Sequence, residues 1–391
     1  MGLLVWYHLA LSLLYAFTAI GVAAESLNGF RTQQPPPSPK PLTAALVVAY
    51  LPAEAHIILE SLWAIYYTGS FDQIILAYNT PEPLLLECKL RSMPWLDAVR
   101  VPSSRSKAEN LNHVLDQRII NCPIVAIFDA DHRPDKSAPA FAADWLAAGY
   151  AAVQGRCVIA NSGQLPWLVR AEFTHIYRLL HQSRFNILGT GIFGGSNCYW
   201  SVEVLQRFRF DPDRMTEDID LSLRVIESGY AIAHDPRIIS HEVAPETLGQ
   251  LWKQRTRWAQ GWLEVTVGNV HRLLRSPRLT WWQKAYWVWS MYYREVFTYL
   301  SLSVYLLLAW YWVAPPHLAL WQEAVFTGSS VVVIASLAVV VAALRAADKD
   351  AAAVGYGVAS FPFVAFKGLV HLNALGRWLV GNRRWEVTRK G

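Results

Sequence analysis

Apolar positions along this chain form short runs in its first half and much longer runs towards its two ends. Runs of strand length occupy residues 44–49, 73–78 and 125–128, and a helix-length run at 57–67 separates the first two. Strands that alternate with helices predict βαβ units and a mostly parallel sheet. Ligands of such sheets bind at the carboxyl ends of the strands, so we expect the polar residues that follow these runs to share one rim.

The apolar stretch 3–24 has the length of a transmembrane helix, because at about 1.5 Å per residue it spans about 33 Å. A cleaved signal peptide is the alternative, since the small residues at 21–24 resemble a cleavage site, but no Lys or Arg precedes the apolar run. The first basic residues after it are Arg31 and Lys40. The positive-inside rule therefore places the N-terminus outside and the following domain in the cytosol.

The second half of the chain contains further membrane-directed segments. Segments 247–270 and 280–293 mix Trp and Tyr with Lys and Arg, a pattern typical of helices that lie in the membrane interface. Segments 297–313 and 324–344 are apolar enough to cross. Polar residues interrupt segment 351–380, and a full crossing would put the basic C-terminal tail outside, against the positive-inside rule. We therefore expect a re-entrant or interfacial segment there and a cytosolic tail.

Composition supports a membrane protein. Apolar residues make up 53% and charged residues 17% of the 391 residues, with 18 Trp and 17 Tyr, as in chains with aromatic belts at the bilayer surface. The net charge of +5 is modest, and its basic residues cluster near membrane segments, so we expect lipid headgroups and no nucleic acid as partners. The four cysteines are far apart and lack a zinc-type spacing, which fits a reduced cytosolic domain.

Two carboxylates, Asp129 and Asp131, follow the apolar run 125–128. Hard divalent cations prefer oxygen ligands, so this pair could hold Mg²⁺ or Mn²⁺ while the metal binds and neutralises a diphosphate leaving group. A solvated acidic turn is the alternative. Tyr50, after the first strand, and Asn79, after the second, are expected on the same rim.

A second acidic motif, Thr216-Glu217-Asp218, precedes an amphipathic run at 221–226 that is predicted to be helical. Thr216 could cap this helix, and acids are favoured in a first helical turn, which would be a purely structural explanation. The functional interpretation makes Asp218 the general base that takes the proton from an acceptor hydroxyl in an inverting transfer.

On the predicted helix 247–270, Gln254 and Arg257 share a face with Trp258. Arg257 could bind a pyrophosphate, and Trp258 could stack on an acceptor sugar. An interfacial Trp beside a snorkelling Arg is the alternative. Lys107, which precedes the metal-binding strand, could also reach the diphosphate.

In this order and spacing the motifs resemble the family 2 glycosyltransferases of the cellulose, chitin and hyaluronan synthase type, from about residue 42 to the C-terminus. The resemblance implies an α/β GT-A fold with a Rossmann-like, mostly parallel sheet, a UDP-sugar donor, a divalent metal, and inversion of configuration. The positions that it implies are the catalytic pair Asp218 and Glu217, donor-binding Tyr50, Glu54, Asn79, Lys107, Asp129, Asp131, Gln254 and Arg257, metal ligands Asp131 and Asp129, and acceptor-binding Gly195, Ser196 and Trp258.

The C-terminal tail carries a further likeness, to the gating loop of cellulose synthases, at Trp385, Val387, Thr388 and Lys390. In that family the loop closes over bound nucleotide, so the resemblance also implies a cytosolic tail. The chain departs from the family after its first strand, where Glu54 follows Tyr50 at a longer spacing than usual. Uracil recognition is therefore less strongly implied than sugar transfer.

Two functions share this catalytic set. A β-glycan synthase would extend a polysaccharide at the membrane from UDP-glucose or UDP-N-acetylglucosamine, and the small number of membrane segments would then call for a minimal pore or a second subunit. A lipid glycosyltransferase would add one sugar to diacylglycerol, a sphingolipid or a polyprenyl phosphate. The gating-loop likeness favours the polymer, and the small number of membrane segments favours the lipid. A non-catalytic scaffold is disfavoured because the catalytic carboxylates are present.

The sequence therefore predicts an integral membrane protein with a cytosolic catalytic domain, interfacial amphipathic helices and about three or four transmembrane helices. Its expected divisions are a membrane anchor at 1–30, a Pro-rich linker at 31–41, the GT-A catalytic domain at 42–245, interfacial helices at 246–295, membrane segments at 296–380 and a gating-loop-like tail at 381–391.

Overall fold

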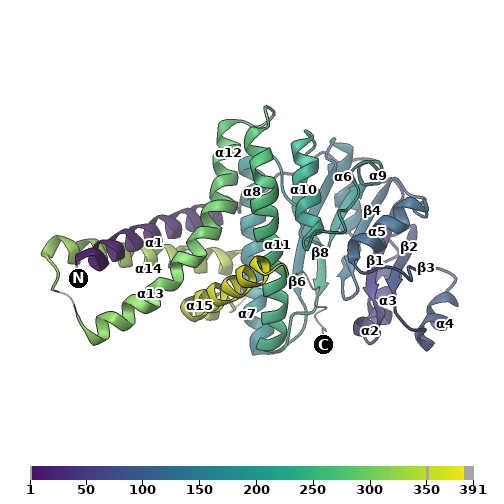
Figure 1. Cartoon of the computed structure of the whole chain (residues 1–391). Coiled ribbons are helices and arrows are strands. Elements are labelled where there is room, and N and C mark those ends of the chain that lie inside the picture. The colour runs from purple at the N-terminus through teal and green to yellow at the C-terminus, as the bar shows by residue number, and fades with distance from the viewer. Residues whose placement is uncertain (1, 316, 349–351, 383–391) are drawn as a thin grey trace.

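The protein consists of a sheet domain and a bundle of long helices that projects from one side of it (Figure 1). The computed structural model describes residues 2–315, 317–348 and 352–382. Within these residues the sheet has eight strands in the order β3-β2-β1-β4-β7-β6-β8-β5. The strands are β1 (Thr43–Tyr50), β2 (Gln73–Asn79), β3 (Asp97–Arg100), β4 (Ile124–Asp129), β5 (Arg133–Pro134), β6 (Ala152–Ile159), β7 (Cys198–Ser201) and β8 (Ile232–Glu242).

Parallel pairing dominates the first half of the sheet, as predicted. β1 lies between β2 and β4 and is parallel to both, with Tyr50 opposite Asn79 and Val48 opposite Asp129. The three polar residues expected on one rim therefore do lie at the same edge. In the second half β7 is antiparallel to both β4 and β6, while β6 and β8 are parallel. Only β1, β2 and β4 were predicted from the sequence. The strands β3, β5, β6, β7 and β8 were not, because polar residues interrupt most of them and the others are only two to four residues long.

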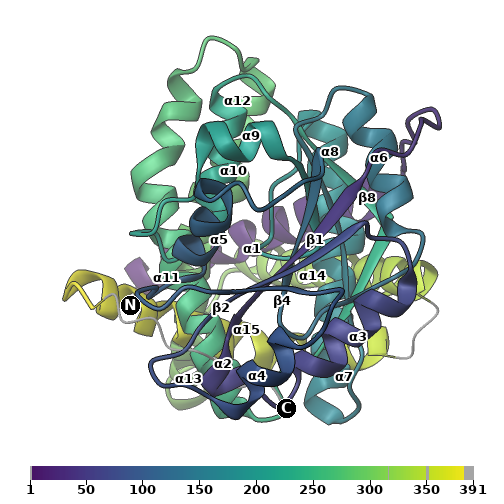
Figure 2. The same cartoon turned by 90° about the vertical axis from the view of Figure 1, so that its right-hand side faces the viewer.

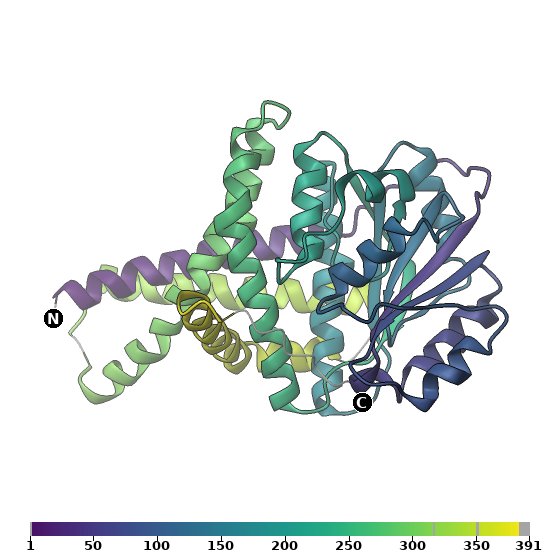
Figure 3. The same ribbon diagram turned by 45° about the vertical axis from the view of Figure 1, so that its right-hand side comes forward.

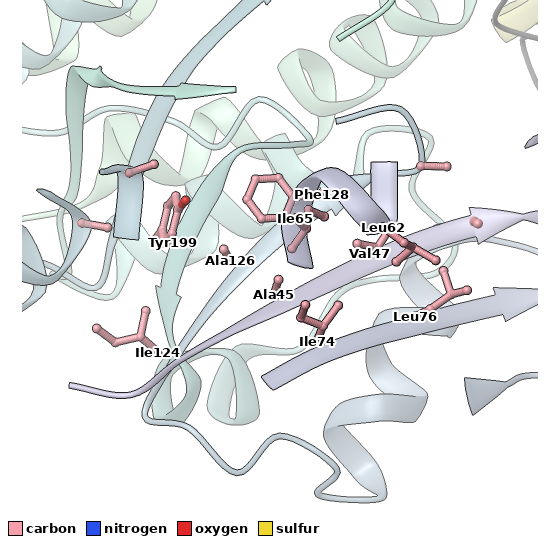
Figure 4. Close-up of a cluster of buried hydrophobic side chains, with 14 of the residues drawn as sticks. Ala45, Val47, Leu62, Ile65, Ile74, Leu76, Ile124, Ala126, Phe128 and Tyr199 are labelled. Carbon is pink, nitrogen blue, oxygen red and sulfur yellow. The ribbon is translucent and has the colours of Figure 1, made fainter. Parts of the chain in front are cut away.

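Helices cover both faces of the sheet, which is why the central strands are apolar throughout. Alternate residues of β1 point to opposite faces, and Ala45 and Val47 pack with Leu62 and Ile65 (Figure 4). The helices of this domain are α2 (Leu51–Glu54), α3 (Ile58–Thr68), α4 (Leu85–Arg91), α5 (Lys107–Asp116), α6 (Ala138–Ala147), α7 (Gln164–Phe173), the π-helix η1 (Thr174–Leu180), α8 (His181–Leu188), α9 (Val202–Phe208) and α10 (Glu217–Glu227). Clusters of buried side chains join α3 and α6 to one face, and α5, α9 and α10 to the other.

One long helix, α11 (Leu248–Arg275), stands between the sheet domain and the bundle (Figure 3). The bundle contains α1 (Gly2–Asn28), α12 (Trp281–Trp287), the π-helix η2 (Val288–Tyr293), α13 (Arg294–Val313), α14 (Leu320–Asp348) and α15 (Ala352–Leu379). α1 lies along α14, behind the strands when the molecule is viewed from the sheet side (Figure 2). Among the described residues, four helical segments are long and apolar enough to cross a membrane: Gly2–Asn28, Trp281–Val313, Leu320–Asp348 and Ala353–Leu379.

Two segments differ from the sequence-based expectation. Segments 280–293 and 297–313 were predicted as separate helices, but the helical run Trp281–Val313 is continuous. This run contains no Gly or Pro to end a helix, and the change of direction between α12 and α13 falls at the π-helix η2 (Figure 1). Segment 351–380, expected to be re-entrant or interfacial, forms the single helix α15 in spite of Pro362 within it. That this segment does not cross the membrane fully stays a prediction.

Candidate active site

A cavity of about 820 Å³ begins at the carboxyl ends of β1, β2 and β4 and extends between α7–η1–α8, α11, α13 and α15. Most residues that the sequence predicted for the site line it, although they come from distant parts of the chain. They are Tyr50, Glu54, Asn79, Lys107, Asp129, Gly195, Ser196, Glu217, Asp218, Gln254, Arg257 and Trp258. The gating-loop-like residues Trp385, Val387, Thr388 and Lys390 lie outside the described residues.

The rim formed by β1 and β2 is fixed by hydrogen bonds to loops and helices. The Tyr50 backbone N–H donates to Glu54 Oε2 at 2.7 Å, which folds the longer spacing between these residues into the short helix α2. Asn79 Nδ2 donates to the Ser104 carbonyl at 3.1 Å, and Asn79 Oδ1 accepts from Asn110 Nδ2 at 3.1 Å. Both ends of the Asn79 amide are thus engaged, and its orientation at the rim is defined.

Lys107 lies at the start of α5, and its side chain reaches the centre of the cavity. Its Nζ donates to Asp129 Oδ1 and to the carbonyl of Gly195. Burial disfavours the charged ammonium, but the neighbouring carboxylates of Asp129, Glu217 and Asp218 outweigh this effect and raise the pKa of Lys107. The Asp129 N–H donates to Ser196 Oγ at 3.0 Å, so the loop that contains Gly195 and Ser196 is held to the end of β4.

Asp131 has a different environment from Asp129. It is 1% exposed, its Oδ2 accepts a hydrogen bond from the Val243 N–H at 2.9 Å, and it is not among the described residues that line the cavity. The next residue, His132, lines the cavity instead. The spacing of the two Asp residues in the sequence could not reveal this difference. Asp131 is bound by the backbone N–H of Val243, which directly follows the distant strand β8.

A group of possible metal ligands lies beside Asp129. One ligand atom from each of His132, Cys157 and Glu242 falls within 4.8 Å of the other two. Imidazole nitrogen and carboxylate oxygen suit Mn²⁺ better than Mg²⁺, which prefers oxygen alone. Soft sulfur, as in the Cys157 thiol, is a poor ligand for hard cations such as Mg²⁺ and Mn²⁺. His132 and Glu242 therefore fit a divalent metal better than Cys157 does.

The acidic motif at the start of α10 also lines the cavity. Burial raises the pKa of Asp218 to about 7, and the neighbouring Glu217 contributes in the same direction while Lys107 opposes it. Gly195 approaches this carboxylate closely, with φ of +87° and its would-be Cβ only 3.1 Å from Asp218 Oδ2. A side chain at position 195 would therefore be strained and would crowd the acid. A carboxylate with a pKa near neutrality is suited to proton transfer.

Thr216 does not cap α10, contrary to one expectation. It stands at the N-cap position, but its side chain makes no capping hydrogen bond. Its Cγ2 lies 2.3 Å from where a Cβ on Gly261 would be, so Thr216 packs directly on α11. The side chain is used for contact between two helices and not for the local turn.

The motif on α11 begins after a capping box, in which Thr247 Oγ1 accepts from the Gln250 N–H at 3.2 Å and Gln250 Oε1 accepts from the Thr247 N–H at 3.1 Å. One turn later Gln254, Arg257 and Trp258 all line the cavity, as their spacing predicted. The helix is therefore well anchored at the end nearest the site.

Sequence reasoning missed the membrane-side half of the cavity. Its walls include Glu172 and Arg184 from α7–η1–α8, Arg255 from α11, and Arg294 and Lys367 from α13 and α15. Arg255 lies within the motif Gln254–Trp258, but no motif marks the other four positions. The only sequence signal is a charged residue within an otherwise apolar helical run, which could equally lie on a surface.

Comparisons with known proteins identify the family that this chain resembles. A sequence model of the family described as glycosyl transferase family group 2 matches residues 124–344. Poly-β-1,6-N-acetyl-D-glucosamine synthase of Staphylococcus aureus (strain COL) is 29% identical over 185 residues, 46% of this chain and 44% of that protein. The enzyme of the same name from Staphylococcus epidermidis is 28% identical over 181 residues, 45% of this chain and 43% of that protein. The chain spans less than half the length of these curated relatives.

A solved structure is similar over nearly the whole chain. The mannosyltransferase PcManGT from Pyrobaculum calidifontis, in complex with GDP-mannose and Mn²⁺, covers 96% of this chain and 99% of its own, with a TM-score of 0.61 and 20% sequence identity. At this identity the likeness concerns the fold, and it confirms the predicted GT-A architecture. Because the family match covers more than half of the chain, the protein belongs to the family 2 glycosyltransferases.

Proposed function

We propose that this enzyme moves a sugar, glucose or N-acetylglucosamine, from its UDP donor onto a growing β-linked polysaccharide at the membrane. The observation that carries the proposal is one continuous cavity that is lined by Asp129, Asp218 and Trp258 together. The similarity to poly-β-1,6-N-acetyl-D-glucosamine synthases over part of the chain supports a polymeric product.

The donor would lie across the carboxyl ends of the strands. In the proposal the nucleotide contacts Tyr50, Glu54 and Asn79, and the diphosphate lies near Lys107. A divalent metal held by Asp129 or Asp131, with His132 and Glu242 from the group described above, would neutralise the leaving diphosphate when bound. Mn²⁺ or Mg²⁺ could serve, and the mixed nitrogen and oxygen donors favour Mn²⁺. Gln254 and Arg257 approach the same region from α11.

Asp218 acts as the general base in this proposal. The acceptor hydroxyl attacks the anomeric carbon from the side opposite the diphosphate, the bond from that carbon to the diphosphate oxygen breaks, and the hydroxyl proton passes to Asp218. One displacement inverts the configuration at the anomeric carbon. Lys107 remains positively charged next to the carboxylates, so it can stabilise the diphosphate that departs.

The acceptor would occupy the part of the cavity beyond Asp218. Trp258 offers an aromatic face for a pyranose ring, and the loop with Gly195 and Ser196 borders the reacting end. The growing chain would leave between α11, α13 and α15, with a second subunit if these helices alone do not form a path.

Transfer to a membrane lipid is the second candidate, and one observation favours it. Arg294, Lys367 and His371 line the cavity from helices long enough to cross a membrane. A lipid headgroup could therefore reach the cavity from the bilayer.

One experiment separates the two candidates. Purified protein in lipid is incubated with Mn²⁺ or Mg²⁺ and labelled UDP-glucose or UDP-N-acetylglucosamine, and products are divided into organic-soluble lipid and ethanol-insoluble polymer. Insoluble label that a specific glycosidase releases is the expected result. Label confined to the organic phase would replace the polymer proposal with the lipid one, and no transfer from either donor would contradict both UDP-sugar assignments.

A further inference from the structure

Glu172 is a buried carboxylate with two cationic partners from other helices. Glu172 lies near the C-terminal end of α7, is 1% exposed and lines the cavity. Its Oε2 lies 2.7 Å from Arg255 Nη2 of α11, and its Oε1 lies 2.7 Å from Lys367 Nζ of α15. Each carboxylate oxygen therefore serves a different helix, and the three elements meet at one side chain.

Arg255 carries this arrangement to the proposed acceptor site. Its guanidinium carbon lies 4.3 Å from the ring centroid of Trp258 and 5.6 Å from that of Phe173. A cation held over an indole face restricts the ring as well as attracting it. Glu172 holds one side of the guanidinium while the indole of Trp258 lies against its face, so the carboxylate acts on the orientation of the indole through Arg255.

Ionised Glu172 compensates one of the two positive charges of Arg255 and Lys367. Burial alone would favour its neutral form, but Arg255 and Lys367 outweigh burial and lower the pKa of Glu172. Without that negative charge, Arg255 and Lys367 would face each other unpaired on the cavity wall. Arg255 would then be repelled from its present position over Trp258.

We propose that Glu172 is a positioning residue for the acceptor site, which holds Arg255 against Trp258 and fastens this platform to α15 through Lys367. The inference rests on the proposed function, because Trp258 is an acceptor platform only there. Glu172 does not touch the donor-side cluster of Lys107 and Asp129 in this arrangement, so its removal should act on the acceptor and spare the nucleotide.

A double-mutant cycle tests the inference with Glu172→Gln, Trp258→Ala and the double variant. The probe is a short β-linked N-acetylglucosamine oligosaccharide supplied as primer, and the readouts are primer KM, kcat and the Kd of UDP. We expect Glu172→Gln to raise primer KM by about tenfold, with the Kd of UDP unchanged within about twofold. The double variant should be no worse than Trp258→Ala alone. Glu172→Asp, which keeps the charge, should restore part of the primer affinity.

Glu87→Gln is the matched control. Glu87 is also buried and lies 3.5 and 3.6 Å from Arg91 and Arg100, but it is not among the described residues that line the cavity. It should lower the unfolding temperature without changing primer KM. An unchanged primer KM in Glu172→Gln, additive effects in the cycle, or equal losses of primer and UDP affinity would overturn the positioning role. Failure of the wild-type enzyme to extend any primer would instead contradict the proposed function, and with it the acceptor role of Trp258.

Discussion

At the scale of single residues, the carboxyl group of Asp218 is the most strongly adapted to its proposed task. Its pKa is raised from 3.8 to about 7, mainly by burial. A general base works when ionised, so kcat/KM for transfer is expected to rise with pH through about 7 and to level off above it. A pH–rate profile with saturating primer measures this. An acid limb centred near pH 4 would show that an ordinary exposed carboxylate limits the reaction.

The same shift predicts a change in stability. The folded protein keeps the Asp218 proton at pH values where the unfolded chain releases it, so this group lowers the free energy of unfolding as pH rises from about 4 to about 7. Asp218→Asn removes the titration. The variant should therefore unfold at a higher temperature than wild type at pH 8, with a smaller difference at pH 5. Thermal unfolding in one detergent at both pH values is the measurement, and a gain that is larger at pH 5 would contradict the assignment.

Most site residues could be predicted because the motifs combined suitable chemistry with a definite place at a strand or helix end. Asp218 and Trp258 are examples, and both line the cavity. The contacts of Asp131 and Thr216 were harder to predict, because the direction of each side chain depends on Val243 and Gly261, respectively, which lie further along the chain. The role of Glu172 could not be predicted from the sequence, because the packing of α7, α11 and α15 determines its partners.

At the scale of elements, the contact between α10 and α11 brings the two catalytic motifs together. It depends on Gly261, where a Cβ would meet Thr216 Cγ2 at 2.3 Å and Oγ1 at 2.8 Å. Gly261→Ala should therefore push the helices apart, lower stability by about 1–3 kcal/mol and reduce transfer. Gly249→Ala on the same helix is the control, because nothing lies within 4 Å of its would-be Cβ. It should be neutral or stabilising by up to about 1 kcal/mol. Denaturant unfolding measures both variants. Equal changes in the free energy of unfolding would show that close packing at Gly261 has no special role in stability.

Element types were predictable where the period of the apolar pattern was clear, as in β1, β2 and β4. The boundary between the membrane-directed helices 280–293 and 297–313 was not, because no Gly or Pro in this stretch ends a helix. The run Trp281–Val313 accordingly continues where the composition suggested a break. The short antiparallel strands depend on long-range pairing and leave little trace in the local sequence.

At the scale of the whole molecule, the account places the sheet domain in the cytosol and the link between α13 and α14 outside. Cys88 on α4 is exposed, and the other three cysteines are buried. A membrane-impermeant maleimide should therefore leave Cys88 unlabelled in intact cells and label it after permeabilisation. In a Cys88→Ser background, His317→Cys should be labelled in intact cells, whereas Gly391→Cys should be protected. Labelling of Cys88 in intact cells together with protection of His317→Cys would contradict this orientation. Labelling of Gly391→Cys in intact cells, with the other two positions as expected, would mean that α15 crosses the membrane.

The central claim is that one enzyme site uses Asp218 as the base for sugar transfer. Its most direct test is the rate of transfer from labelled UDP-sugar by Asp218→Asn, compared with wild type, alongside the Kd of UDP for both proteins. We expect transfer to fall by at least about 100-fold while the Kd of UDP changes by less than about threefold. A variant that transfers sugar at the wild-type rate would contradict the assignment of the base and the mechanism built on it.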